Sequence, residues 1–384
     1  MKRLGCLILA AAMLLLLPVT AQAQQAEYEG KSYLLMDAAT GTVLQNHNEH
    51  EALPPASVTK VMTLLLIMEA VDSGAIGWQD TVTASEAAAA KGGSQVYLKP
   101  GETMTVEEMV KSIAVSSAND CACAMAEFLA GTEQAFVEKM NEKAAALGMK
   151  DTHFVNCTGL DDGADAKDHR TSAYDIALMS RELLTAHPDI KRFTTIWMDS
   201  VRGGSFGLSN TNKLIRFYPG ATGLKTGFTS GAGYCLSASA LRDGLELIAV
   251  VMGCQTSAQR FTTCRQMLDY GFSAYTLYEA PIPADAAVPV KLGKHAQVSL
   301  TPQGDCRLLV EKAKSSALQT QMTLTPEVSA PVHQGDVLGQ AQVVCDGEVL
   351  LTIPLTAAQD VPRKTFADFF FRLLGLAAMA DPQV

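Results

Sequence analysis

One segment of this 384-residue chain is apolar on almost every side, and it constrains the fold more than any other feature. The segment runs from Val58 to Ala70. Its large apolar residues are Val61, Met62, Leu64, Leu65, Leu66, Ile67 and Met68. A helix that is apolar all round belongs in the middle of a protein core, because a surface helix keeps one polar face. We therefore expect a large domain that is built around a buried helix at residues 58–70.

The chain around this helix mixes strand patterns with helix patterns. Strands are predicted at 32–37 and 42–44, and again at 234–240 and 246–252, where an Asp-Gly pair between the last two is typical of a hairpin. Further helices are predicted at 106–113, 121–129, 132–147 and 172–185. Because the helices lie between early and late strands, we expect an α/β or α+β domain over residues 27–278.

The composition changes after Pro281-Ile282-Pro283, where short alternating segments replace the helical patterns. These segments cover residues 296–300, 307–310 and 322–324, and a hairpin is predicted around Asp346-Gly347 between 342–344 and 348–353. A run of short strands with turn residues between them is typical of an all-β fold. We therefore expect a second, small all-β domain at residues 281–362.

The N-terminus has the pattern of a secretory signal. Lys2 and Arg3 precede an apolar run from Leu4 to Leu17, and the small-residue triplet Ala21-Gln22-Ala23 follows. A retained transmembrane anchor is the alternative, but the run is shorter than the ~20 residues that cross a bilayer. We expect residues 1–23 to be removed and the protein to be exported.

The C-terminus has a different pattern at residues 363–380. Lys364, Asp368 and Arg372 recur every four residues, while phenylalanine and leucine fill most of the other positions. Such a helix is too short to span a bilayer but suits its interface, with the aromatic rings among the acyl chains. The alternative is a terminal helix that packs on the protein itself. We expect a membrane-anchor helix on the outer face of the cytoplasmic membrane.

Charge and cysteine spacing exclude other classes of function. Lys and Arg number 30 against 40 Asp and Glu, so a net charge of -10 argues against a nucleic-acid partner. Eight of the nine cysteines follow the signal, and they are scattered: Cys121, Cys123, Cys157, Cys235, Cys254, Cys264, Cys306 and Cys345. Zinc-site spacing is lacking, so we expect mostly buried small hydrophobes and no metal; the spacing leaves their disulfide state open.

The start of the apolar helix also carries a candidate nucleophile, in the sequence Ser57-Val58-Thr59-Lys60. A spacing of three places the Ser57 hydroxyl and the Lys60 amine on one helix face, so the amine can take the hydroxyl proton. A free lysine has a pKa near 10.4, and a base role requires burial or a nearby cation to lower it. The apolar helix supplies the burial. Taken alone, most such sequences are ordinary surface helix starts.

Two further segments strengthen the hypothesis. Ser117-Ala118-Asn119 precedes the predicted helix at 121–129, and Lys225-Thr226-Gly227 leads toward the strand at 234–240. This set of three motifs is typical of penicillin-binding proteins and serine β-lactamases. The chain closely resembles the D-alanyl-D-alanine carboxypeptidases, which are low-molecular-mass penicillin-binding proteins. The resemblance also covers 93–101, 156–161, 222–240, the β-rich domain and the C-terminal helix, so it spans nearly the whole mature chain.

The resemblance implies a penicillin-binding/β-lactamase-like catalytic domain, a small all-β domain and an amphipathic helix. It implies that Ser57 attacks the penultimate D-Ala carbonyl of a peptidoglycan stem peptide ending in D-Ala-D-Ala, and forms an acyl-enzyme. Lys60 would act as the base, and Ser117 would relay a proton to the departing D-Ala. Asn119 would bind the substrate backbone. No cofactor is implied, and β-lactam antibiotics would be covalent inhibitors.

The resemblance also assigns residues around this centre. Lys225 would orient Ser117 and lower the pKa of Lys60, while Thr226 and Arg260 would hold the terminal carboxylate of the substrate. The backbone N–H groups of Ser57 and Phe228 would form the oxyanion hole. The chain departs from the family pattern at two positions: Phe228 stands where close relatives often carry His, and Ala118 replaces the more frequent Gly. Both changes can affect the deacylation rate or the substrate preference.

Two alternatives remain beside the carboxypeptidase. A serine β-lactamase shares all three motifs, but class A enzymes deacylate with a Glu-activated water. The nearest candidates for that role, Glu138 and Asn141, lie inside a predicted helix at the wrong separation. A wall-binding scaffold with an inactive site is the non-enzymatic alternative. The intact Ser57, Lys60, Ser117 and Lys225 argue against it.

One further motif is a decoy. Gly203-Gly204-Ser205-Phe206-Gly207 matches the nucleophile elbow of α/β-hydrolases, which requires a strand before it, a helix after it and a later histidine. A turn-prone stretch follows instead, and the later histidines, His295 and His333, lie in the second domain. We therefore predict that this serine is not a nucleophile.

Overall fold

The computed structural model describes residues 28–163 and 165–370. A five-stranded antiparallel sheet in the order β2-β1-β9-β8-β7 forms the middle layer of the first domain. Its strands are β1 (Ser32–Asp37), β2 (Val43–His47), β7 (Ala221–Thr229), β8 (Gly233–Arg242) and β9 (Leu245–Cys254). Because β1 pairs with β9, the two ends of the domain's sequence meet in one sheet. Both predicted hairpins are confirmed.

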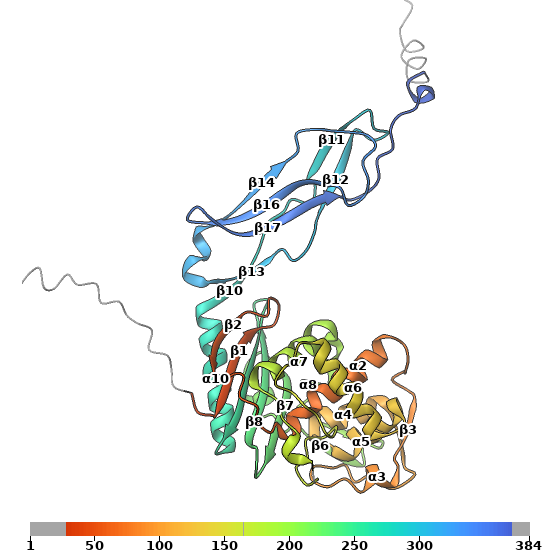
Figure 1. The fold of residues 1–384 in the computed structure, drawn as a ribbon, viewed down its shortest axis with the longest axis vertical. Coiled ribbons are helices and arrows are strands. Elements are labelled where there is room, and N and C mark those ends of the chain that lie inside the picture. The colour runs from red at the N-terminus through yellow and green to blue at the C-terminus, as the bar shows by residue number, and fades with distance from the viewer. Residues whose placement is uncertain (1–27, 164, 371–384) are drawn as a thin grey trace, which may run out of the picture.

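Helices cover both faces of this sheet (Figure 1). On one side lies α10 (Ser257–Ala274), which packs Cys264, Met267 and Leu268 against β1, β8 and β9. On the other side lies a helical lobe. Its main helices are α2 (Lys60–Asp72), α4 (Val106–Ser116), α5 (Asn119–Ala130), α6 (Glu133–Ala146) and α7 (Ala173–Ala186). The domain is therefore a helix–sheet–helix sandwich, which agrees with the predicted α/β or α+β class.

The apolar helix α2 lies at the centre of this lobe. Val61, Leu65 and Ile67 have no exposed surface, and α4, α5, α6 and α7 contact the helix from different sides. The regular helix begins at Lys60, two residues later than predicted, because a 3-10 turn, η2 (Ala56–Thr59), precedes it. Turns of this kind are common where an α-helix begins.

Small elements complete the lobe. They are β3 (Thr81–Thr83), α3 (Glu86–Ala89), β4 (Thr103–Thr105), η3 (Ala166–Asp168), η4 (Pro188–Ile190), α8 (Lys191–Thr194), β5 (Met198–Val201), β6 (Phe206–Ser209) and α9 (Leu214–Phe217). The decoy serine, Ser205, lies in the turn of the β5–β6 hairpin and not between a strand and a helix. The prediction that it is not a nucleophile elbow is confirmed.

The second domain is all β, as predicted. Its six-stranded sheet has the order β14-β16-β17-β12-β11-β15. The strands are β11 (Ala287–Lys291), β12 (Gln297–Pro302), β14 (Leu318–Leu324), β15 (Val328–Ser329), β16 (Val337–Cys345) and β17 (Glu348–Ala357). Val298, Val343 and Leu355 are among the buried residues of its core. The predicted hairpin around Asp346-Gly347 joins β16 to β17.

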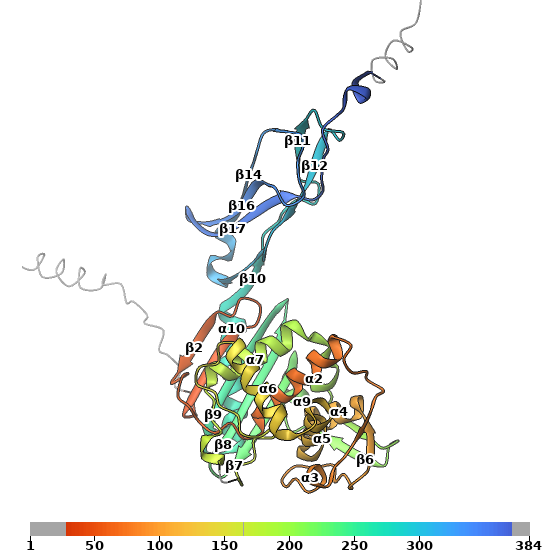
Figure 2. The same cartoon turned by 45° about the vertical axis from the view of Figure 1, so that its right-hand side comes forward.

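The connection between the domains was not predicted. β10 (Tyr275–Glu279) follows α10 directly and pairs with β13 (Arg307–Glu311), next to the short turn η5 (Lys312–Ala317). The Lys312 amine donates a hydrogen bond to the Phe272 carbonyl at 2.7 Å, which ties η5 to α10. Figures 1 and 2 both show the β domain at one end of the catalytic domain, with β10 between them.

Both predicted terminal segments lie wholly or largely outside the described residues. The signal at 1–23 lies outside them completely, and of the helix predicted at 363–380 the structure describes a helical turn at 366–370. Among the described residues, no helix combines the length and the apolar character that crossing a membrane requires. Of the eight cysteines after the signal, seven are buried and Cys306 is half-buried, as the sequence predicts.

Candidate active site

Ser57 and Lys60 meet at the start of α2, as the motif predicts. The Lys60 amine is 2.9 Å from the Ser57 hydroxyl, and it donates a second hydrogen bond to the Thr158 carbonyl at 2.8 Å. Lys60 is 0% exposed. The 3-10 turn brings the two side chains together because residues three apart eclipse in that geometry.

Burial gives Lys60 the protonation behaviour of a base. Removal of the amine from water lowers the pKa of Lys60 to about 7, although the nearby Cys157 and Asp120 act in the opposite direction. About half of the amine is then neutral at pH 7, against a very small fraction for a free lysine. The apolar environment of α2 therefore supplies a neutral amine next to the Ser57 hydroxyl.

Lys225 is a second buried amine, and it lies on β7. Its Nζ donates a hydrogen bond to the Thr226 carbonyl at 3.0 Å. Burial lowers the pKa of Lys225 well below its usual value, and the charges of Lys60 and Arg260 lower it further. Burial is thus the main cause of the lowered pKa at both amines, and the repulsion from Lys60 adds to it at Lys225. The site disfavours a state in which both amines are protonated.

Ser117 and Asn119 lie on opposite sides of the connection between α4 and α5. Ser117 ends α4 in a left-handed conformation with φ +64°, and Asn119 begins α5. The Asn119 side-chain N–H donates to the Gly92 carbonyl at 2.7 Å. Its Oδ1 is buried and has no hydrogen-bond partner among the described residues. That oxygen can accept an N–H from a bound substrate.

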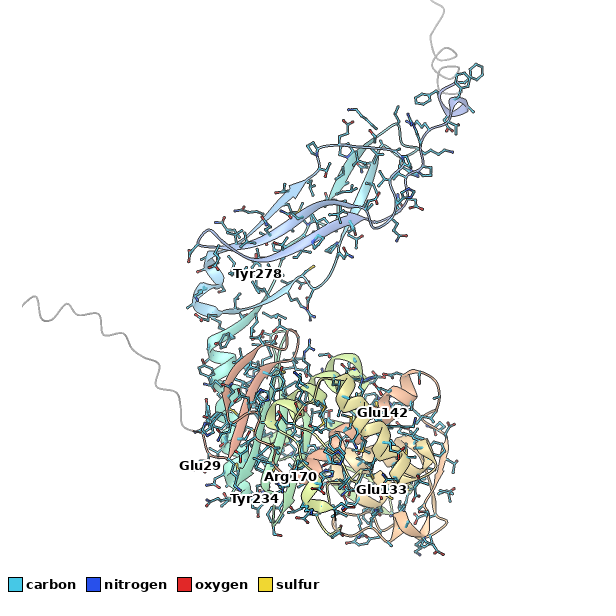
Figure 3. All side chains as sticks on the ribbon, in the orientation of Figure 1. Glu29, Glu133, Glu142, Arg170, Tyr234 and Tyr278 are labelled. Atoms are coloured by element: carbon cyan, nitrogen blue, oxygen red, sulfur yellow. The ribbon has the colours of Figure 1, made fainter. Side chains whose placement is uncertain are left out.

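The motif glycine lets β7 touch the nucleophile turn. A Cβ atom on Gly227 would lie 2.6 Å from the Pro55 carbonyl oxygen and 3.2 Å from the Ser57 nitrogen, so only glycine fits there. Phe228 follows it, is half exposed and stacks on Tyr234 with ring centroids 4.2 Å apart. Figure 3 labels Tyr234 on the sheet and Glu133 on the helical lobe. The turn η2, which carries Ser57, contacts β7, so the site lies between these two layers.

Thr226 and Arg260 occupy different positions around β7. The Thr226 hydroxyl donates to the Thr211 hydroxyl at 2.7 Å, on the segment that follows β6. Arg260 comes from α10, donates to the Gly227 carbonyl at 2.9 Å and lies 5.2 Å from the ring centre of Tyr234. The structure therefore holds the Arg260 charge against the strand that carries the motif.

Sequence reasoning missed a chain of hydrogen bonds behind the nucleophile, which runs through Thr59 and His169. The Thr59 hydroxyl donates to the Ala56 carbonyl at 2.8 Å and lies 2.7 Å from His169 Nε2. The Val155 N–H donates to His169 Nδ1 at 3.1 Å, so the other ring nitrogen carries the proton and donates to Thr59. Burial lowers the pKa of His169 to about 4, and the charges of His153 and Lys60 add to this effect. A neutral ring thus fixes the turn that carries Ser57.

The second missed feature is the loop that supplies the Thr158 carbonyl. Asn156 Oδ1 accepts the backbone N–H groups of Thr158 and Gly159. Gly159 has φ +82°, and a Cβ there would lie 1.8 Å from the Ala56 carbonyl oxygen. The only sequence signal was the resemblance over 156–161, which gave this segment no role. The hydrogen bond between Thr59 and His169 had no sequence signal, because it joins residues 110 positions apart.

The two deacylation candidates of the β-lactamase alternative have other positions. Glu138 is exposed on α6. The Asn141 amide pairs with both backbone groups of Phe154, at 2.9 Å each. Neither residue makes a hydrogen bond to Ser57 or Lys60 within the described part of the chain. Neither side chain is therefore held against the Ser57–Lys60 pair.

Comparisons with known proteins agree with this architecture. The family model described as D-alanyl-D-alanine carboxypeptidase matches residues 19–256, and the model of the penicillin-binding protein 5 C-terminal domain matches residues 272–363. Among curated relatives, the D-alanyl-D-alanine carboxypeptidase DacF of Bacillus subtilis is 43% identical over 98% of each chain. DacA of Escherichia coli is 33% identical over 88% of this chain and 85% of its own.

Solved structures give the same result. Penicillin-binding protein 5 from Haemophilus influenzae has a TM-score of 0.73 and 28% identity, over 88% of this chain and 98% of its own. Penicillin-binding protein 6B from Escherichia coli has a TM-score of 0.71 and 30% identity, over 87% and 97%. On the family match, the relatives and the shared architecture, this chain belongs to the D-alanyl-D-alanine carboxypeptidase family.

Proposed function

We propose that Ser57 is the nucleophile through which this serine-type D-Ala-D-Ala carboxypeptidase removes the terminal D-alanine from peptidoglycan pentapeptides. The observation that carries the proposal is the 2.9 Å contact between the Ser57 hydroxyl and a fully buried amine. Burial lowers the pKa of Lys60 to about 7, so the amine is available as a base near neutral pH. The rest of the site supports the two halves of the reaction.

In the first half, neutral Lys60 takes the proton of the Ser57 hydroxyl along this contact. The Ser57 oxygen attacks the carbonyl carbon of the penultimate D-Ala, and the carbonyl oxygen becomes an oxyanion. The backbone N–H groups of Ser57 and Phe228 donate to it. Loss of one such donor costs about 3 kcal/mol of barrier in comparable sites. The close approach of Gly227 to the nucleophile turn supports this placement of Phe228.

The tetrahedral intermediate then breaks its C–N bond. The departing D-Ala amine needs a proton, and Ser117 relays to it the proton that Lys60 took from Ser57, so Lys60 is neutral again. Lys225 orients the Ser117 hydroxyl during this transfer. A water molecule attacks the remaining ester, with Lys60 again as the base. The products are free D-alanine, the shortened stem peptide and regenerated Ser57.

Three side chains fix the substrate during these steps. The Thr226 hydroxyl and the positive charge of Arg260 hold the terminal carboxylate, since Arg260 is anchored against the Gly227 carbonyl on the same strand. The buried Oδ1 of Asn119 lacks a partner among the described residues and accepts a backbone N–H of the stem peptide. A peptide held at both ends presents its carbonyl carbon to Ser57.

β-Lactam antibiotics acylate the same serine. Penicillin-binding protein D2 from Listeria monocytogenes has solved ampicillin-bound and cefotaxime-bound forms, and it is 29% to 30% identical over 64% of this chain. A β-lactam presents a strained amide carbonyl to Ser57, and ring opening leaves an ester without a departing amine. Because Glu138 and Asn141 do not reach the site, we propose that this ester is hydrolysed slowly.

The sequence patterns at both ends support a reaction outside the cytoplasmic membrane. The signal pattern at residues 1–23 supports export and removal of that segment, and the amphipathic pattern at 363–380 supports attachment to the outer face of the membrane. Phe366, at 85% exposed, and the half-exposed Phe369 and Phe370 support the second point. The catalytic domain at 27–278 and the β domain at 281–362 then face the cell wall.

Two measurements test the proposed function. Incubation with penicillin followed by intact-mass analysis is expected to show a long-lived adduct on Ser57 and none on Ser57→Ala. Rapid turnover of the antibiotic would instead indicate a β-lactamase, and absence of an adduct a scaffold. Release of D-Ala from a pentapeptide, lost in Ser57→Ala, separates the carboxypeptidase from both alternatives.

A further inference from the structure

An exposed tyrosine on the rim of the site is held in a conformation that tyrosine rarely adopts. Tyr97 has φ +59°, in the left-handed region, and its side chain is 69% exposed. Its hydroxyl makes no hydrogen bond to any described residue. Hydrogen bonding of the side chain therefore does not explain this conformation, and strained residues of this kind often occur at functional sites.

The backbone on both sides of Tyr97 is fixed by two charged groups, the buried Asp120 and the half-buried Arg202. The Asp120 carboxylate accepts the N–H groups of Val96 and Leu98, at 3.1 and 3.0 Å. From the opposite side, the Arg202 guanidinium donates to the Val96 carbonyl at 2.8 Å. Such charge-assisted bonds are stronger than neutral ones, so the loop is rigid where it presents the ring. With both neighbours bonded inward, the Tyr97 side chain points outward.

This loop is continuous with the active site. Asp120 follows Asn119 directly, and the Asn119 backbone N–H and side-chain amide donate to the carbonyls of Ser94 and Gly92, both at 2.7 Å. The other wall is the β5–β6 hairpin, and Figures 1 and 2 both show β6 next to α5. The residue that follows the hairpin, Thr211, accepts the hydrogen bond of Thr226. The rim thus connects the side of the active site that carries Asn119 to the side that carries Thr226, where the substrate carboxylate is proposed to bind.

The two walls enclose a cavity of about 560 Å³ with an amphipathic lining. Tyr97 and Phe206 supply ring surfaces, with centroids 6.3 Å apart at 65°, and the Arg202 guanidinium lies 5.3 Å from the Phe206 ring centre. The Glu102 carboxylate accepts a hydrogen bond from Arg202 Nε at 2.6 Å. The exposed Lys99 amine makes no ion pair or hydrogen bond within the described part of the chain.

We propose that this cavity, lined by Tyr97, Phe206 and Lys99, is a subsite for a sugar ring of the peptidoglycan strand to which the stem peptide is attached. A pyranose has a face of C–H groups and an edge of hydroxyl and acetamide groups. The C–H face fits the electron-rich face of an aromatic ring, and the polar edge can accept from Lys99. A peptide would instead need backbone partners, and the other charged groups of the lining, Glu102 and Arg202, are already bonded to each other. The proposal rests on the proposed function, since it places a second part of the same substrate.

A binding comparison tests this subsite without relying on turnover. The Ser57→Ala protein, which cannot be acylated, is titrated by calorimetry with a free pentapeptide and with the same pentapeptide on its GlcNAc–MurNAc disaccharide. We expect the disaccharide form to bind about fivefold to tenfold more tightly, the size of one good aromatic contact. Tyr97→Gly removes the ring and accepts the positive φ, and it is expected to bring the two dissociation constants together.

Two control variants and the opposite outcomes complete the test. Tyr97→Phe keeps the ring and Phe217→Ala removes another exposed aromatic side chain, and both are expected to keep the preference for the disaccharide form. Equal affinities of the Ser57→Ala protein for the two ligands would overturn the sugar subsite. A Tyr97→Gly variant that weakens the binding of both ligands in parallel would also overturn it, because that result would mean that Tyr97 binds the peptide. Failure of active enzyme to release D-Ala, with the binding preference intact, would refute the proposed function and leave the subsite standing.

Discussion

The reactivity of Ser57 depends on the protonation state of one amine. Burial lowers the pKa of Lys60 to about 7, and only the neutral amine can take the hydroxyl proton. The neutral fraction rises with pH, from roughly a tenth at pH 6 to roughly nine-tenths at pH 8. We expect the second-order rate constant for acylation by penicillin to rise through this range with a midpoint near pH 7, measured by stopped-flow or quenched intact-mass kinetics.

The control for this pH dependence is Lys60→Arg. Its guanidinium stays charged throughout the range, so acylation is expected to fall by several orders of magnitude at every pH. A profile in the native protein that is flat between pH 6 and pH 8, or that falls with rising pH, would contradict the assignment of Lys60 as the base.

A second residue-scale prediction concerns His169. Burial lowers the pKa of His169 to about 4, whereas an unfolded histidine titrates near 6.5. Between these values the unfolded state binds more protons than the folded state, so stability is lost as the pH falls from 6.5 to 4. The contribution of this one group is roughly 3 kcal/mol, present in full above pH 6.5. We expect urea unfolding free energies to fall over that range.

His169→Asn removes the titrating group and serves as the comparison. Its absolute stability is expected to be lower, because the Thr59 and Val155 hydrogen bonds are changed, but its slope against pH between 6.5 and 4 is expected to be shallower. Equal slopes in the two proteins would show that other groups cause the acid sensitivity.

At the scale of elements, the contact between the 156–160 loop and the nucleophile turn is the tightest in the site. A Cβ on Gly159 would lie 1.8 Å from the Ala56 carbonyl oxygen, so Gly159→Ala must displace the turn that carries Ser57. Gly148 is a matched control, because it too has positive φ, +74°, but has open space around its Cβ position. We expect Gly148→Ala to cost about 1 kcal/mol and to leave penicillin acylation unchanged.

Gly159→Ala is expected to cost more than that strain and to slow acylation at least tenfold, since misplacement of a nucleophile by about 1 Å has effects of that size. The measurements are the melting temperature and the rate of adduct formation for both variants. If the two variants acylate at the same rate, the loop does not position Ser57.

Sequence patterns predicted the elements that have a strong local signal. The all-apolar pattern of α2, the alternating hairpins and the turn at Asp346-Gly347 are each decided within about ten residues, and all were confirmed. Helix α10 was missed, because its apolar stripe is interrupted by Arg260, Thr263 and Gly271, and the sheet it covers decides its conformation. Residues Lys225-Thr226-Gly227 were expected to lead toward a strand, whereas they lie inside β7.

The residues of the candidate site were also predictable from sequence only where the signal is local. Ser57 and Lys60 could be paired from spacing alone, because they share one turn. The other members were assigned by resemblance, and Thr158, Gly159 and His169 were not assigned at all. Their contacts join residues about 100 positions apart, and such contacts depend on tertiary packing that no local pattern records.

At the scale of the whole molecule, the β domain separates the catalytic site from the C-terminal turn. The catalytic domain and the turn at 366–370 lie at opposite ends of the β domain in both views (Figures 1 and 2). The Lys364 N–H donates to the Leu292 carbonyl at 2.8 Å, which ties the start of this segment to the β domain. An anchor at one end would hold the site away from the membrane and toward the wall.

Removal of the tail tests this arrangement. We expect protein truncated after Pro362 to lose co-sedimentation with anionic phospholipid vesicles and to keep its rate of D-Ala release from a soluble pentapeptide, because the tail does not contribute to the active site. A more selective variant replaces Phe366, Phe369 and Phe370 with serine and keeps every charge. Burial of a phenylalanine side chain is worth about 1.5–3 kcal/mol, so three replacements are expected to weaken vesicle binding by at least about 1,000-fold.

The two variants distinguish apolar insertion from simple charge attraction. If the rings enter the acyl layer, the serine variant stays weak at any salt concentration; if charge alone holds the tail, it binds like the native protein and both are released by salt. Unchanged sedimentation of the truncated protein would remove the anchor altogether and favour the alternative in which the helix packs on the protein. In that case truncation is expected to lower the melting temperature, because packed aromatic surface would be lost from the β domain.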